Sequence, residues 1–131
     1  MITVAIIGIL ATVAFPSYVD YIRRGKLQEG FAELSGARVK LEQYYQDFRN
    51  YGTAGGSCLP QAELPANSKY FTYTCAMGST NQTYTITAAG KGDISGYEYT
   101  LNQSNVKTTT QFKGETVNKS CWITKASESC D

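Results

Sequence analysis

The sequence predicts an α+β fold in which one long N-terminal helix packs on a four-stranded antiparallel sheet. Three observations support this: an uncharged apolar front over residues 1–15, a helical apolar stripe that continues to Asn50, and alternating strands between Lys69 and Thr110. A chain of 131 residues has the length of one domain. We divide it into an apolar half of the helix (1–22), which we term the stalk, and a globular domain (23–131).

The composition argues against catalysis and against a strongly charged partner. The chain contains no histidine, which is the commonest general base and a common metal ligand. Charged residues make up 18% of the chain and the net charge is +1, so electrostatics give no strong attraction to nucleic acid. We therefore expect a protein that is not an enzyme and needs neither a cofactor nor a metal.

The stalk is apolar on every side of the expected helix, and such a helix is stable where all of its faces are buried. Burying each large apolar side chain is favourable by roughly 1.5–3 kcal/mol, and the whole set by on the order of 15–25 kcal/mol. A secretory signal peptide is the alternative, but no basic region precedes the apolar run. The residues that we expect to pack in this way are Ile2, Val4, Ile6, Ile7, Ile9, Leu10, Val13, Phe15 and Val19.

The expected helix is too long for its own domain to cover. From Met1 to Asn50 it would measure about 75 Å at 1.5 Å per residue. The stalk must therefore project, and either a lipid bilayer or a bundle of identical stalks would bury it. Charged residues lie at the end of the stalk and directly after it, where an emerging helix would meet lipid headgroups, namely Asp20, Arg23, Arg24 and Lys26.

Gly8 and Pro16 mark the weakest part of this helix. Pro16 has no amide hydrogen and its ring clashes with the carbonyl of Thr12, while glycine is a poor helix former. We expect the helix to kink over this stretch in the monomer and to unwind in an assembly.

Residues 23–51 predict an amphipathic continuation of the helix with one stripe to bury. Glycines from Gly52 onward mark the end of the helix. Arg38 occupies one position of the otherwise apolar stripe. The apolar members of the stripe are Leu27, Phe31, Leu34, Leu41, Tyr45 and Phe48.

The second half of the chain predicts the sheet that covers this stripe. After a loop over residues 52–68, apolar and polar residues alternate in a manner typical of half-buried antiparallel strands. The sheet spans residues 69–110, and a C-terminal disulfide region follows over 111–131. The expected strands are Lys69–Cys75, Gln82–Ala88, Tyr97–Leu101 and Val106–Thr110.

The front of the chain carries a specific resemblance. Its apolar run, Gly8, Pro16 and the following Ser17-Tyr18 resemble, in order and spacing, the N-terminal helix of type IV pilins. The resemblance begins shortly after the start of the mature pilin. About six residues, including the methylated phenylalanine and a glutamate, are therefore expected to precede Met1, with the leader peptide before them.

Later segments resemble the PilE-like and ComP-like branch of the same family more loosely, through Glu42-Gln43-Tyr44-Tyr45 and Cys121-Trp122. The resemblance implies a ladle-shaped fold and helical polymerisation of identical subunits into a thin extracellular pilus on a bacterial surface. It implies adhesion, twitching motility, biofilm formation or DNA uptake as roles. It also implies an inner-membrane precursor pool and a pilus assembly machinery as partners.

Two alternatives share the stalk. One is a ComP-like minor pilin that acts as a DNA receptor, and the other is a secretion-system pseudopilin. Pseudopilins often bind calcium through clustered acidic residues, and no such cluster occurs near the C-terminus, so this alternative ranks lower.

Four cysteines, Cys58, Cys75, Cys121 and Cys130, suggest two disulfides and an oxidising compartment. No C-x2-C pair is present, which disfavours a zinc site. Of the three possible connectivities we favour Cys58–Cys75 with Cys121–Cys130, because each closes a short loop worth about 3 kcal/mol. The resemblance supports the second pair, since pilins commonly bound a C-terminal surface loop in this way, here over 122–129.

Lysines near Trp122 suggest a possible DNA contact, because lysines bind phosphates and aromatic rings stack on bases. Nearby carboxylates almost cancel the lysine charges, so a solvated surface of mixed charge is favoured. The residues that we expect to make surface contacts in this loop are Trp122, Lys119 and Lys125.

Overall fold

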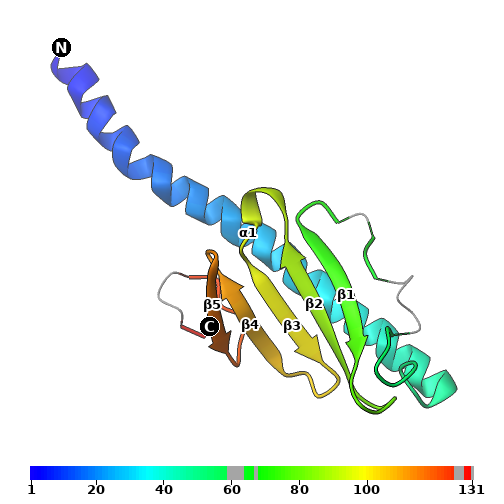
Figure 1. Ribbon diagram of the computed structural model, residues 1–131. Coiled ribbons are helices and arrows are strands. Elements are labelled where there is room, and N and C mark those ends of the chain that lie inside the picture. Colours follow the sequence, from blue (N-terminus) through cyan, green and yellow to red (C-terminus); the bar gives the residue numbers. More distant parts are fainter. Residues whose placement is uncertain (59–63, 67, 126–128, 131) are drawn as a thin grey trace.

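The computed structural model describes residues 1–58, 64–66, 68–125 and 129–130. Helix α1 (Ile2–Phe48) runs along the whole molecule, and an antiparallel sheet lies along its C-terminal half (Figure 1). The five strands are neighbours in chain order: β1 (Phe71–Met77), β2 (Tyr84–Gly90), β3 (Glu98–Asn102), β4 (Lys107–Phe112) and β5 (Glu115–Lys119). A short 3₁₀ helix (Gly92–Ile94) lies between β2 and β3.

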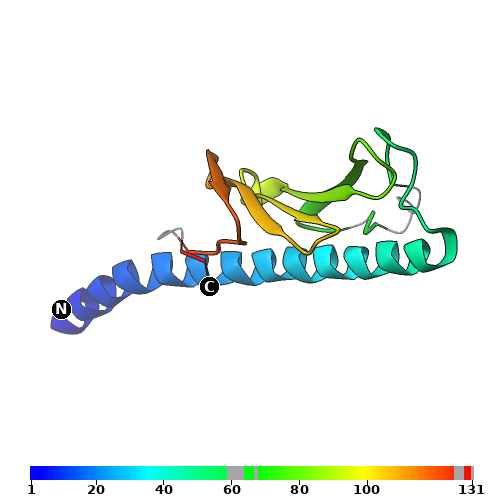
Figure 2. The same ribbon diagram turned by 90° about the horizontal axis from the view of Figure 1, so that it is seen from below.

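Helix and sheet form two layers, as predicted from the sequence. Figure 2 shows the sheet on one side of α1, with the N-terminal part of the helix extending beyond it. The sheet faces the helix with alternate residues only: the burial of β1 alternates strictly between buried and exposed side chains from Phe71 to Met77. The apolar stripe of the helix and the apolar face of the sheet therefore pack together in one core.

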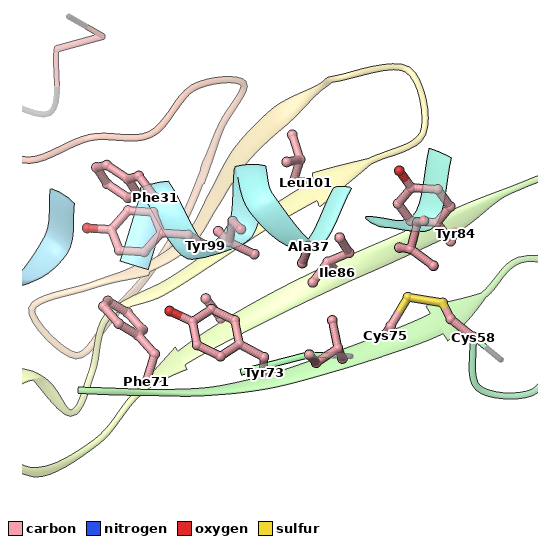
Figure 3. Close-up of a cluster of buried hydrophobic side chains, with 14 of the residues drawn as sticks. Phe31, Ala37, Cys58, Phe71, Tyr73, Cys75, Tyr84, Ile86, Tyr99 and Leu101 are labelled. Carbon is pink, nitrogen blue, oxygen red and sulfur yellow. A yellow bond between two sulfur atoms is a disulfide. The ribbon is translucent and has the colours of Figure 1, made fainter. Parts of the chain in front are cut away.

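The core lies between α1 and the inner face of the sheet. Leu27, Leu34 and Leu41 of the helix are almost fully buried against it. Figure 3 shows Phe31 and Ala37 of α1 beside side chains from three strands. The strand residues that the figure labels in this cluster are Phe71, Tyr73, Cys75, Tyr84, Ile86, Tyr99 and Leu101.

Gly30 lets α1 approach the sheet closely. A Cβ atom at Gly30 would lie only 2.3 Å from the ring of Phe71, which is 1% exposed. The ring cannot move aside easily because it is packed in the core. The sequence analysis did not identify this glycine, because an isolated glycine inside a helical pattern carries no signal of what lies opposite.

Helix α1 is continuous through Gly8 and Pro16. Its axis curves over the stalk, and it does not break (Figure 2). Pro16 removes the hydrogen bond to the carbonyl of Thr12, and a bend is the usual response of a helix to that loss.

The helix ends earlier than the glycines indicate. Arg49 adopts the left-handed conformation with φ 57°, and its backbone N–H donates to the Tyr45 carbonyl at 2.8 Å. The expected continuation to residue 51 is therefore wrong, and the cap is an arginine. The loop that follows includes isolated bridges at Gly52–Cys58 and Ser57–Ala76. Residues 59–63 and 67 of the predicted 52–68 loop lie outside the described residues.

The last residue of the predicted stripe does not join the core. Phe48 is exposed and stacks on Tyr44, with ring centroids 4.4 Å apart. Tyr45 is only partly buried, and its ring stacks on Tyr51. The helix extends past the end of the sheet here, so the sheet has no strand to cover Phe48.

A fifth strand, β5, corrects the prediction of four. Its residues are exposed or half-buried and show no apolar alternation, so the sequence pattern does not reveal it. The tight turn before it has positive φ at both central residues, 53° at Lys113 and 85° at Gly114. This geometry favours a two-residue hairpin. Lysine is unusual as the first central residue of such a turn, so the sequence did not indicate a hairpin here.

The disulfides pair Cys58 with Cys75 and Cys121 with Cys130, with Cα atoms 5.6 and 5.7 Å apart. This is the connectivity favoured from loop length. The first disulfide ties the loop after α1 to β1 beside the core (Figure 3).

We predict that Gly30→Ala will destabilise the domain by about 1–3 kcal/mol, because the added methyl group overpacks the contact with Phe71. Thermal unfolding of the full chain in detergent micelles, followed by circular dichroism, measures this. Gly36→Ala is the matched control, since a Cβ at that helical glycine meets nothing within 4 Å. It should stabilise the helix by roughly 0.5–1 kcal/mol. Equal effects of the two substitutions would contradict the close helix–sheet approach.

Buried tyrosines predict a loss of stability at high pH. Burial and a hydrogen bond to Glu42 raise the pKa of Tyr51 to about 12. Burial also raises the pKa of Tyr73, Tyr84 and Tyr99 above the usual range. Unfolded tyrosines release their protons near pH 10 while the folded ones stay neutral, so stability is full below pH 10 and falls above it.

The free energy of unfolding, measured between about pH 9 and 12, should therefore decrease with pH. Tyr84→Phe should make this decrease shallower, and Tyr21→Phe, at an exposed position, is the control. A decrease that Tyr84→Phe leaves unchanged would count against the buried phenol as its source.

Candidate assembly surface

The stalk exposes a large apolar surface. Every large apolar side chain that the sequence analysis assigned to it is between 51% and 78% exposed. The first buried residue of α1 is Leu27. Exposing many aliphatic side chains to water is unfavourable in free energy relative to burying them. This surface therefore needs a partner that covers it.

The stalk is apolar around its whole circumference. Residues on successive helical faces, such as Ile6, Ile7 and Ile9, are all more than half exposed. By length and composition, α1 contains a segment apolar enough to cross a membrane. The same property suits the centre of a bundle of identical helices, because both environments bury every face.

The junction between stalk and domain is charged. Asp20 forms ion pairs with Arg23 and Arg24, the latter at 2.6 Å. Lys26 forms an ion pair with Asp93 in the connection between β2 and β3, and this hydrogen bond holds the pKa of the Asp93 carboxyl below its usual range. The sequence analysis identified the helical charges, but not their partner in the sheet.

Trp122, expected in an exposed loop, lies half-buried on the domain. Its ring stacks on Phe31 with centroids 4.7 Å apart, and its Nε1 donates to the Thr100 carbonyl at 2.9 Å. The Lys107 ammonium lies over the same ring, 4.7 Å from its centroid. The indole therefore has partners within the domain, which leaves little of it for a nucleic-acid base.

The segment after Trp122 is also anchored. Ile123 is fully buried, and its backbone N–H donates to the Thr109 hydroxyl at 3.0 Å. The Tyr99 hydroxyl donates to the Ile123 carbonyl at 2.9 Å. The expectation of an exposed loop over 122–129 is wrong for Ile123 and for the buried Thr124, and residues 126–128 lie outside the described part.

The lysines of the final quarter lie on different elements. Lys107 contacts the indole, whereas Lys113 occupies the turn between β4 and β5. Lys119 pairs with Thr109 in the ladder of β4 and β5. Within the described residues, no three His, Cys, Asp or Glu side chains lie together as a metal site.

Comparison with known proteins connects this geometry to a family. A family model described as "Type IV minor pilin ComP, DNA uptake sequence receptor" matches residues 16–122. The type IV major fimbrial protein FimA of Dichelobacter nodosus is 33% identical over 107 residues, which cover 82% of this chain and 65% of FimA. The fimbrial protein EcpC of Eikenella corrodens is 45% identical over 47 residues, covering 36% of this chain and 31% of EcpC.

Solved structures agree on the fold. The non-core minor pilin PilV of Neisseria meningitidis aligns with a TM-score of 0.61 at 20% identity, covering 74% of this chain and 95% of that one. A type IV pilin of Shewanella oneidensis aligns with a TM-score of 0.51 at 15% identity, covering 65% and 89%. The chain spans between 31% and 65% of the length of the curated relatives named above.

Proposed function

We infer that this chain, which belongs to the type IV pilins, is a structural subunit that polymerises through α1 into a type IV pilus. The family match over residues 16–122 establishes the membership. The role that we propose is structural and not enzymatic. The filament would lie on a bacterial surface and serve adhesion, twitching motility, biofilm formation or DNA uptake.

The observation that carries this proposal is the exposure of the stalk on all sides. Side chains such as Ile2 and Val13, 78% and 71% exposed, have no partner surface on their own domain. In a filament of identical subunits, neighbouring stalks would bury one another and recover roughly 1.5–3 kcal/mol for each side chain. Because no face of the stalk is polar, a central bundle suits it better than a pairwise contact.

Before assembly the same stalk would reside in the inner membrane. A bilayer buries an apolar helix on every face, and α1 has the length and composition to cross one. The assembly machinery would then transfer the subunit from lipid to filament. Gly8 and Pro16 would ease this transfer, because the stretch between them is the weakest part of the helix and can unwind in the assembled state.

We predict that Ile9→Asp will abolish filament formation while the domain stays folded. A carboxylate in a dry helix bundle is left unpaired and costs several kcal/mol. Electron microscopy of sheared surface filaments measures assembly, and trypsin resistance of the solubilised subunit reports folding.

Val106→Asp is the matched control, since Val106 is an exposed apolar residue in the turn between β3 and β4, far from the stalk. Normal filaments from Ile9→Asp would exclude the stalk as the filament core. Loss of filaments from both variants would attribute the effect to charge in general.

A DNA receptor is the second candidate, and the description of the matching family favours it. Lys119 and Lys125 are the residues proposed to hold phosphates. The contacts of Trp122 within the domain argue for phosphate binding over base stacking. Such binding would be strongly dependent on salt.

We predict that the full chain, if it acts as this receptor, shifts duplex DNA in a mobility assay at physiological salt. The double substitution Lys119→Gln and Lys125→Gln should lower the salt slope of the affinity by about two, or one per phosphate contact. Lys40→Gln, on the helix, is the control. The absence of a shift by the unmodified chain would remove this candidate and leave the structural role intact.

A further inference from the structure

We propose that the stalk-facing end of the domain binds the headgroups of anionic phospholipids while the subunit resides in the membrane. This inference rests on the proposed membrane pool of a pilus subunit. It concerns a set of cations at the junction of α1 and the sheet. We call this set the basic collar, and it consists of Arg23, Arg24, Lys26, Lys69, Lys91 and Lys113.

The sheet topology brings the strand members of the collar to one end of the sheet. Phe71 at the start of β1 pairs with Gly90 at the end of β2, and Phe112 at the end of β4 pairs with Glu115 at the start of β5. The segment before β1 and the connections β2–β3 and β4–β5 therefore meet at this end. These three segments carry Lys69, Lys91 and Lys113.

The helix contributes the other members at the same end. Lys26 pairs with Asp93 of the β2–β3 connection, and its ammonium lies 5.1 Å from the centroid of the Tyr70 ring. The Arg23 guanidinium lies 5.8 Å from the centroid of the Tyr97 ring. This end of the domain faces along α1 toward the stalk (Figure 1), which is the direction of the membrane in the proposed pool.

The collar carries more cations than carboxylates. Its six cations outnumber the five carboxylates near them, which are Asp20, Glu29, Asp93, Glu98 and Glu115. The turns at the opposite end, residues 78–83 and 103–106, contain no charged residue, and the strand ends beside them carry Lys107 and Lys119. In a chain of net charge +1, this places a positive surface next to the stalk.

A groove at the collar has the amphipathic lining that a lipid needs. It lies between α1 and the β2–β3 connection and has a volume of about 310 Å³. Val19, Ile22 and Ile94 line its apolar side, and Arg23 and Lys26 supply its cations. Asp93, which pairs with Lys26, also lines the groove. An acyl chain could follow the apolar stalk while the phosphate meets the two cations.

The collar arginines already pair with Asp20, and their side chains keep part of their surface exposed, 19% for Arg23 and 41% for Arg24. Guanidinium groups bind phosphate through paired N–H bonds, so the partly exposed Arg24 side chain could bind a phosphate oxygen in this way. The ring of Tyr97 already holds the Arg23 guanidinium in place, which reduces the entropy lost on binding.

The position of the collar along the helix also suits a bilayer surface. The run without charged side chains, residues 1–19, is followed directly by the charged residues of the junction. Tyr18 and Tyr21, both well exposed, flank the end of this run, and tyrosines gather at the interfaces of membrane proteins. The next turn of the helix places Arg23 and Arg24 at the phosphates.

The collar selects anionic over zwitterionic headgroups. Each cation near the surface strengthens binding to an anionic lipid by about fivefold. Phosphatidylethanolamine offers the same phosphate with an ammonium beside it, which the collar repels. Phosphatidylglycerol has no such group.

The test uses the full chain reconstituted into vesicles with equal amounts of phosphatidylglycerol and phosphatidylethanolamine of identical acyl chains. Native mass spectrometry after mild detergent release counts the lipids retained on each subunit. We expect phosphatidylglycerol to exceed phosphatidylethanolamine by about fivefold or more. The triple variant Arg23→Gln, Arg24→Gln and Lys26→Gln should reduce this preference to parity.

Two further variants keep the result interpretable. Lys69→Gln, Lys91→Gln and Lys113→Gln remove three collar charges outside α1, and should lower the preference without changing the helix. Lys40→Gln, Arg49→Gln and Lys107→Gln remove the same charge elsewhere and should leave it unchanged. Circular dichroism reports folding, and the intact mass of the chain shows whether both disulfides have formed.

The proposal is overturned if the unmodified chain shows no preference, or if the control variant loses as much as the collar variants. It is also overturned if millimolar inorganic phosphate displaces the lipid, because the site would then bind phosphate alone. Filament formation is measured separately in cells. Normal filaments without a lipid preference would reject the collar and leave the pilus role standing, whereas absent filaments with a preference would do the reverse.

Discussion

The stalk cannot be buried within its own molecule, and this constraint shapes the rest of the structure. Helix α1 serves two surroundings along one axis: from Leu27 onward it is covered by the sheet, and before that residue it is exposed. An isolated apolar rod of this kind has no stable place in water. A bilayer and a bundle of copies both satisfy it, which allows one subunit to occupy each in turn.

In the proposed transfer from membrane to filament, the domain must stay folded in both surroundings. Its core depends on contacts within the domain and needs nothing from the stalk. Gly30 allows close contact with Phe71, and Tyr99 fastens Ile123 and the C-terminal segment to the sheet. The two disulfides secure the segments on either side of the sheet, so the core does not depend on where the stalk lies.

The junction is where the two surroundings meet the domain. Ion pairs from Asp20 and Asp93 hold the helix cations in position, and tyrosine rings support Arg23 and Lys26. Trp122, in contrast, is used for packing on Phe31, although its position beside a cysteine suggested a role in surface contacts. Chemical type alone did not separate this structural aromatic residue from the charged residues that we propose to act at the junction.

The sequence by itself determined the helix, four strands, the projecting stalk and the favoured cysteine pairs, because periodicity and apolar runs are local properties. The features that depend on contacts between distant parts of the chain were decided only by the tertiary structure. The sheet ends before Phe48 and leaves it exposed, and Lys113 with Gly114 forms the turn that adds β5. The tertiary structure also brings Lys26 to Asp93, 67 positions away in the chain. Such a contact between distant segments depends on strand register and packing, which no local sequence pattern encodes.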